Sequence, residues 1–186
     1  MLRPDPKRGL ECFVDADWAG SWQHRSSADP SCAHSRTGFV IMYAGCPIMW
    51  SSKMQQLIAL STTEAEYIAL SSALREVIAV MNLLNEIKGR GFPIHHPTPQ
   101  VICNVFEDNR SCIEIATNHK TRPRTKHLSV RLHHFRSHVV NKTIRIQHIS
   151  TKDQLADMFT KPLPRVQFTK LRDQVMGWSP HGSARE

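Results

Sequence analysis

Four acidic residues, far apart in the chain, have the local settings expected of a metal site. They are Asp15 in ECFVDADW, Glu66 in STTEAEYIAL, Asp108 directly after VICNVFE, and Asp157 in QLADMFTKPL. Carboxylate oxygens are ligands that Mg²⁺ prefers, and a cage of them can hold two ions. Because a phosphodiester is itself anionic, carboxylates must act on it through such cations. The sequence therefore predicts a site for two magnesium ions that is suited to phosphodiester hydrolysis.

The two strand carboxylates have neighbours that compete with them. Asp17 shares a strand face with Asp15, because side chains two residues apart point the same way. Asp108 follows a strand, where an aspartate often caps the next helix, but Asn109 can take that position instead. Glu107 is expected to face the opposite side of its strand from Asp108. Since Asp17 lies on the same strand face as Asp15, it stays open as the alternative to Asp15 at the site.

The helix carboxylate has a competitor of its own. Ser61 and Glu64 have the spacing of a capping box, in which the serine caps the helix and the glutamate reaches back. Thr63 and Glu66 have the same spacing. The first pairing leaves Glu66 free for a metal ion, whereas the second would engage it in the cap.

The apolar pattern predicts the elements that position these carboxylates. Strands are expected over residues 10–17, 37–43, 46–50, 100–107 and 143–149. Helices are expected over residues 63–88, 109–117, 128–141, 152–160 and 165–178. Three antiparallel strands followed by alternating helices and strands indicate an α/β protein with helices on the faces of a mixed sheet. One domain is expected over 10–178, with a linker over 1–9 and a disordered tail over 179–186.

Composition indicates a cellular compartment and a class of binding partner for this chain. The 186 residues carry a formal net charge of +8, and 40% are hydrophobic, which favours a folded domain with an anionic partner such as nucleic acid. Five cysteines form no C-x-x-C pair, so we expect a reduced, intracellular and cytoplasmic chain. No apolar run approaches the roughly 20 residues of a membrane span, and we expect no membrane partner. The first ten residues lack the apolar centre of a signal peptide and read as the edge of a longer protein.

Five segments, in this order, resemble one known family. They are VDADWAG, PIMWSSKMQQLIALSTTEAEYIAL, EDNRSCIEIA, RTKHLSVR and STKDQLADMFTKPLP. Together they resemble the C-terminal ribonuclease H domain of copia-type (pseudoviridae) LTR retrotransposon Pol polyproteins. The resemblance implies an RNase H-like fold, with three antiparallel strands, then two parallel strands, and flanking helices. It also implies cleavage of the RNA strand of RNA–DNA hybrids during reverse transcription, with two Mg²⁺ ions or Mn²⁺ as a substitute.

The resemblance also assigns residues and partners. It places the family's four catalytic, metal-binding carboxylates on Asp15, Glu66, Asp108 and Asp157. The expected contacts to the hybrid are Ser61, Thr62, Thr63, Asn109, Arg110, Arg124, Lys126 and His127, of which Arg110 replaces the family's usual glutamine. The last three belong to a basic segment suited to the phosphate backbone. The implied partners are the hybrid and the reverse transcriptase region of the same polyprotein, in virus-like particles.

Three other interpretations stay open. The first is a catalytically silent nucleic-acid-binding or scaffold domain derived from a retroelement polyprotein. The second keeps the fold but changes the substrate to DNA, as in integrase-like nucleases. The third is a zinc site on His134 and His138, which have a suitable spacing but lack further ligands around them.

Overall fold

Five strands form a single mixed sheet in the order β3-β2-β1-β4-β5. The computed structural model describes residues 2–5, 7–22, 28–94, 96, 98, 100–118 and 134–178. The strands are β1 (Leu10–Asp17), β2 (Arg36–Tyr43), β3 (Cys46–Met54), β4 (Cys103–Glu107) and β5 (Ile144–His148). β2 pairs antiparallel with both β1 and β3, whereas β4 pairs parallel with both β1 and β5. The expected sheet, with three antiparallel strands and then parallel ones, is confirmed.

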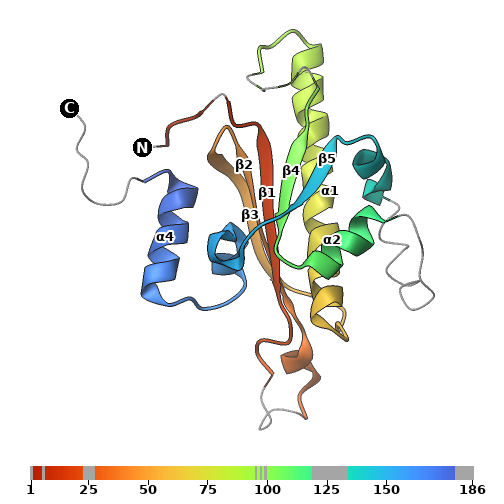
Figure 1. The fold of residues 1–186 in the computed structure, drawn as a ribbon, viewed down its shortest axis with the longest axis vertical. Helices are drawn as coiled ribbons and strands as arrows, with labels where there is room; N and C mark the ends of the chain where they lie inside the picture. Colours follow the sequence, from red (N-terminus) through yellow and green to blue (C-terminus); the bar gives the residue numbers. More distant parts are fainter. Residues whose placement is uncertain are drawn as a thin grey trace.

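Helices cover both faces of this sheet (Figure 1). One face carries α1 (Thr62–Gly89), α2 (Arg110–Thr117) and a helical segment over 134–140; the other carries α4 (Arg165–Met176) and a 3-10 helix, Leu155–Phe159. The side chains of β1 alternate between the two cores, since Cys12 and Val14 join the first and Phe13 joins the second. Central strands such as β1 are therefore apolar on both faces, which explains their continuous hydrophobic runs.

α1 is the main helix of the larger core. Its first half is almost entirely buried against the sheet, and its exposed residues concentrate toward Gly89. By length and composition this helix passes a test for a membrane span, although half of its most apolar stretch is buried inside the fold. The apolar residues of α1 are those of a core helix, because they pack against the sheet.

The expected elements are all found within the described residues, with one correction. The segment over 152–160, expected as one helix, forms two 3-10 helices, Thr151–Asp153 and Leu155–Phe159. Gln154 separates them with an extended backbone, φ −71° and ψ 104°. Its buried side chain turns back toward the strands and hydrogen bonds to their carbonyls, so a continuous α-helix cannot form here. Residues 128–133 of another expected helix and the expected tail lie outside the described residues.

The chain before β1 is attached to the sheet. The amide of Asp5 donates to the carbonyl of Ala44, and the amide of Ala44 donates to the carbonyl of Gly9. The Arg8 guanidinium lies 2.6 Å from the Glu11 carboxylate. The two backbone contacts hold Asp5 and Gly9 against the turn between β2 and β3, while the domain bounds stay a prediction.

Candidate metal centre

The site lies where two neighbouring parallel strands diverge. The pairing of β1 with β4 ends at Phe13 and Phe106, whose rings stack with centroids 4.7 Å apart. Beyond them, Gln154 bridges the widening gap, since its Nε2 donates to the carbonyl of Val14 at 2.9 Å and to that of Phe106 at 3.2 Å. The strand residues that follow no longer pair with each other, so their side chains can converge. A strand-end opening of this kind is a common place for a ligand site in α/β proteins.

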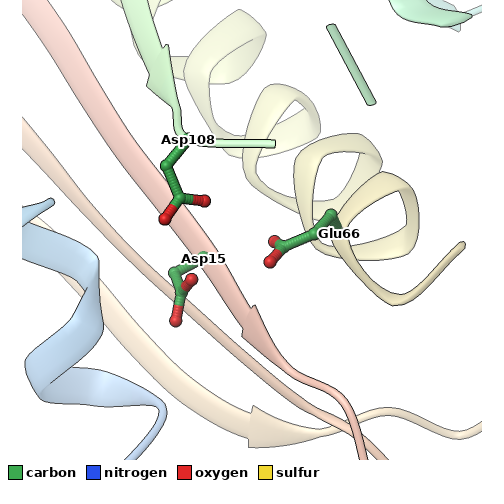
Figure 2. Close-up of side chains that lie close together, drawn as sticks. All are labelled: Asp15, Glu66 and Asp108. Carbon is green, nitrogen blue, oxygen red and sulfur yellow. The ribbon is translucent and has the colours of Figure 1, made fainter. Parts of the chain in front are cut away.

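Three of the four predicted carboxylates meet at this opening. One oxygen each from Asp15, Glu66 and Asp108 lie within 4.8 Å of one another. Figure 2 shows that the three side chains point toward a shared space, from β1, from the first turns of α1 and from the end of β4. Asp15 and Glu66 are buried, whereas Asp108 is half-buried. The tertiary structure thus assembles groups that are 51 and 42 residues apart in the sequence (66 − 15 and 108 − 66).

Each of these carboxylates is held by a contact from another element. The hydroxyl of Thr160 donates to Asp15 Oδ2. The hydroxyl of Thr151 donates to Asp108 Oδ2 at 2.7 Å. The backbone amide of Ala16 supports the carboxylate of Glu66. The orientation of the cluster is therefore fixed before any ligand arrives, as a preorganised site requires.

Burial makes this cluster electrostatically unfavourable on its own. Burial, and then the charges of Glu107, Asp15 and Asp108, raise the pKa of Glu66 well above its ordinary value. Burial also raises the pKa of Asp15, although Thr160 and a nearby lysine oppose it. Like charges crowded away from water favour either protons or a cation. The cluster is thus arranged for a positive ligand.

The competing carboxylates are placed elsewhere. The Ser61 hydroxyl accepts the amide of Glu64 at 3.1 Å, and Glu64 Oε2 accepts the amide of Leu60 at 2.9 Å. Glu64 therefore takes the capping contacts, and Glu66 is left for the site. Asp17, on the same strand face as Asp15, lies outside the three-carboxylate group, with its carboxylate turned toward Gly20.

Asp157 lies beside the cluster and is joined to it by a lysine. Its carboxylate is buried at 1% exposure and lies outside the group of three. Lys161 Nζ is 3.0 Å from Asp157 Oδ1 and 3.6 Å from Asp15 Oδ2. Burial, followed by the charge of Asp15, raises the pKa of Asp157 to about 6. Burial lowers the pKa of Lys161, but the two aspartates outweigh this effect and raise it.

A glycine lets the segment that carries Asp157 approach the sheet. Gly38 pairs with Asp15 across β1 and β2. A methyl group at Gly38 would lie 2.6 Å from Thr160 Cγ2, 2.9 Å from Phe159 Cβ and 3.1 Å from the carbonyl of Ala156. No side chain fits there without displacing the 3-10 helix Leu155–Phe159. Glycine at position 38 therefore allows the segment that carries Asp157 to lie close to Asp15.

The expected substrate contacts are only partly placed. Ser61, Thr62 and Thr63 precede Glu66 at the exposed start of α1, where the hydroxyl of Ser61 serves as the helix cap. Asn109 caps α2, since its Oδ1 accepts the amide of Cys112 at 3.1 Å, and Asp108 is thereby spared. Arg110 is exposed in the first turn of α2. Arg124, Lys126 and His127 lie outside the described residues.

Sequence reasoning missed three residues of this centre. Gln154 lies three residues before Asp157, and Lys161 lies four residues after it in the same segment. The four-residue spacing of Asp157 and Lys161 was a signal for their ion pair. Glu107 faces away from Asp108 as expected, but it is fully buried close enough to Glu66 to be its leading charged neighbour. No local pattern marks such a buried glutamate. The zinc interpretation gains no support, because the group of possible metal ligands found among the described residues is Asp15, Glu66 and Asp108 and contains no histidine.

The centre fits a divalent cation of the magnesium type. All of its donors are carboxylate oxygens, which suit hard cations better than the nitrogen and sulfur ligands of zinc. Glu66 Oε2 and Asp157 Oδ2 are buried and have no hydrogen-bond partner among the described residues. Buried charged oxygens without a partner are costly, and a bound cation removes that cost. Asp15, Glu66 and Asp108 would hold one ion, with Asp157 beside them.

Replacing Lys161 with glutamine is expected to strengthen metal binding. The Lys161 ammonium group contacts Asp15 and Asp157, which a second cation would also approach. The ammonium group and that cation would repel each other. The midpoint of Mg²⁺-dependent thermal stabilisation should fall several-fold, while the metal-free variant should unfold at a lower temperature than the wild type. Lys170→Gln is the control, because Lys170 pairs with the exposed Asp153. An unchanged midpoint in Lys161→Gln would contradict this competition.

Sequence comparison identifies relatives of nearly the whole chain. No family model matches it. The retrovirus-related Pol polyprotein from transposon TNT 1-94 of Nicotiana tabacum is 36% identical over 166 residues, which are 89% of this chain and 11% of that protein. The Pol polyprotein from transposon RE2 of Arabidopsis thaliana is 36% identical over 175 residues, 94% of this chain and 11% of that protein. The chain thus spans about a tenth of the length of these relatives.

Solved structures share the fold. LC11-RNase H1, isolated from compost by a metagenomic approach, gives a TM-score of 0.56 at 16% identity, over 82% of this chain and 93% of that one. The N-terminal RNase H domain of a Mycobacterium tuberculosis protein gives 0.53 at 12% identity, over 89% and 97%. At such identities the likeness shows the fold. The chain is therefore related over nearly its whole length to a segment of retrotransposon Pol polyproteins, and its fold is that of a ribonuclease H domain.

Proposed function

We propose that this domain is a metal-dependent endoribonuclease that cleaves the RNA strand of RNA–DNA hybrids during reverse transcription of a retrotransposon. The observation that carries the proposal is the meeting of Asp15, Glu66 and Asp108 within 4.8 Å at the strand opening, with Asp157 beside them. A similar fold, LC11-RNase H1, has been solved in complex with an RNA/DNA hybrid, with a TM-score of 0.52. The family's polyproteins also support a role in reverse transcription.

The chain's residues would divide the work between holding cations and positioning the hybrid. Asp15, Glu66, Asp108 and Asp157 would bind two Mg²⁺ ions, with Mn²⁺ as a substitute. The bound ions would supply an activated water and stabilise the leaving 3′ oxygen, which gives 5′-phosphate and 3′-hydroxyl products. Thr62 and Thr63 lie about one helical turn before Glu66 at the start of α1.

Substrate selection would come from polar groups on both sides of the carboxylates. Asn109 and Arg110 adjoin Asp108 at the start of α2. Together with Ser61, Thr62 and Thr63 they are suited to the minor groove, where 2′-hydroxyls distinguish RNA from DNA. We propose that Arg124, Lys126 and His127 contact the phosphate backbone, that the reverse transcriptase region of the polyprotein helps to hold the hybrid, and that the protein acts in the cytoplasm within virus-like particles.

The test is strand-specific cleavage by the isolated domain. RNA–DNA hybrid, duplex RNA, duplex DNA and single-stranded RNA, each labelled on a known strand, are incubated with Mg²⁺, with Mn²⁺ or with a chelator. Cleavage confined to the RNA strand of the hybrid, and abolished by the chelator, is the expected result. Retained hybrid binding without cleavage in either metal would instead favour a silent nucleic-acid-binding domain. Cleavage of duplex DNA would favour the integrase-like alternative.

Hybrid binding is expected to weaken as salt rises. The net charge of +8 favours phosphate contacts that release counterions, so log Kd should rise linearly with log salt. Several such contacts would weaken binding at least tenfold between about 50 and 200 mM salt. Fluorescence anisotropy with Ca²⁺ in place of Mg²⁺ measures this slope without cleavage. A flat response over that range would show that the basic residues do not contact the backbone.

A further inference from the structure

A fifth carboxylate lies directly behind the metal centre. Glu107 is the last residue of β4 and has 0% exposure. It faces the α1 side of the sheet, where burial, and then the charge of Glu107, raise the pKa of the thiols of Cys12 and Cys112. Glutamate is rarely buried to this extent unless it has a partner. An apolar residue would fill this position at lower cost, so the carboxylate needs an explanation.

One oxygen of Glu107 fixes the turn that carries Asp108. Glu107 Oε1 accepts the backbone amide of Asn109 at 3.0 Å, and the amide of Asp108 also stabilises this carboxylate. The carbonyl of Glu107 accepts the amide of Ile149, which ties the same residue to the end of β5. The Glu107 carboxylate and the Glu107 backbone carbonyl thus both fix the direction in which Asp108 leaves the sheet.

The charge of Glu107 also acts on Glu66. Burial, and then the charge of Glu107, raise the pKa of Glu66. Glu107 Oε2 and Glu66 Oε2 are both buried and have no hydrogen-bond partner among the described residues. A single buried side chain therefore fixes the turn of one clustered carboxylate and exerts its charge on another.

We propose that Glu107 is a positioning residue for the metal centre, which holds the Asp108 turn by accepting the Asn109 amide. The proposal rests on the proposed function, because it assigns Glu107 to the geometry of that same metal site. Glu107 does not touch the substrate in this assignment. It acts through Asp108, as residues behind metal ligands commonly do.

The test compares two variants that remove different properties of Glu107. Glu107→Met fills a similar volume without an acceptor, whereas Glu107→Gln keeps an oxygen that can accept the Asn109 amide. We expect Glu107→Met to need about tenfold more Mn²⁺ or Mg²⁺ for half-maximal thermal stabilisation, the scale typical of residues behind metal ligands. Glu107→Gln should stay within about threefold of the wild type. Both measurements use the metal ion alone, without substrate.

The metal-free melting temperature separates this role from simple packing. Methionine removes a buried charge that repels the clustered carboxylates but leaves the Asn109 amide without its acceptor, so we expect that temperature to stay close to that of the wild type. A weaker metal response in such a variant cannot be ascribed to unfolding. Glu114→Met, on the exposed side of α2, is the matched control. An unchanged metal midpoint in Glu107→Met would overturn the proposal, as would a Glu107→Gln midpoint shifted as far as that of Glu107→Met.

Failure of the proposed function gives a different result. A wild-type domain that is stabilised by Mn²⁺ but cleaves no hybrid would contradict the proposed activity. The tenfold difference between Glu107→Met and Glu107→Gln would still be present in that case and would support the positioning role. In an active domain, the same metal shift should recur in the Mg²⁺ dependence of cleavage, with the KM for hybrid unchanged.

Discussion

Asp108→Asn is expected to reduce cleavage of an RNA–DNA hybrid at least about a thousandfold, while hybrid binding stays within about twofold. Asparagine keeps an oxygen that can accept the Thr151 hydroxyl, so the turn should survive the change. It removes one of the three charges that lie within 4.8 Å of one another. Loss of a metal ligand costs several kcal/mol of transition-state stabilisation, which corresponds to a rate loss of this size.

The measurement is single-turnover cleavage of a labelled hybrid beside anisotropy binding in Ca²⁺. Asp153→Asn serves as the matched control, because Asp153 carries the same charge on an exposed surface and pairs only with Lys170 among the described residues. It should cleave at the wild-type rate. Cleavage by Asp108→Asn within tenfold of the wild type would show that the three-carboxylate group is not the reaction centre.

Stability of the metal-free protein is expected to fall as pH rises through the range in which Asp157 ionises. Burial and the charge of Asp15 raise the pKa of Asp157 from 3.8 to about 6. Because the folded state then binds this proton more tightly than the unfolded chain, the stabilisation is fully present below about pH 4 and is lost as pH passes about 6. The raised pKa values of Asp15 and Glu66 act in the same direction.

Asp157→Asn isolates this contribution. The variant cannot ionise at this position, so at pH 8 its metal-free melting temperature should exceed that of the wild type by on the order of 5 °C. At pH 4 the two should melt together. Mg²⁺ should stabilise the wild type at pH 8 and the variant much less, because the metal replaces the lost protons. A variant that melts below the wild type at pH 8 would show that the Lys161 ion pair outweighs the repulsion.

The local sequence was enough to predict most of the elements. A continuous apolar run predicted β1, because this central strand is buried on both faces. Apolar residues at three- and four-residue steps predicted α1, because one face of that helix is buried. The sequence also narrowed the cap of α1 to two capping boxes, and the structure selected the one formed by Ser61 and Glu64. The segment over 152–160 was predicted incorrectly as one helix. Its interruption depends on Gln154, whose side chain bonds to the carbonyls of Val14 and Phe106, more than 45 residues away in sequence (154 − 106 = 48).

The sequence by itself marked Asp15, Glu66 and Asp108 as candidates, because each lies at a strand end or near a helix start, whereas Asp157 was assigned through the family resemblance of its segment. Only the tertiary structure decided how they are arranged: Asp15, Glu66 and Asp108 form one group, while Asp157 is linked to Asp15 through Lys161. It alone decided that Glu107 is buried behind them. Distances between residues on different elements depend on where β1 and β4 diverge and on the close approach that Gly38 allows. Neither is encoded within a single element, since both arise from packing between segments distant in the chain.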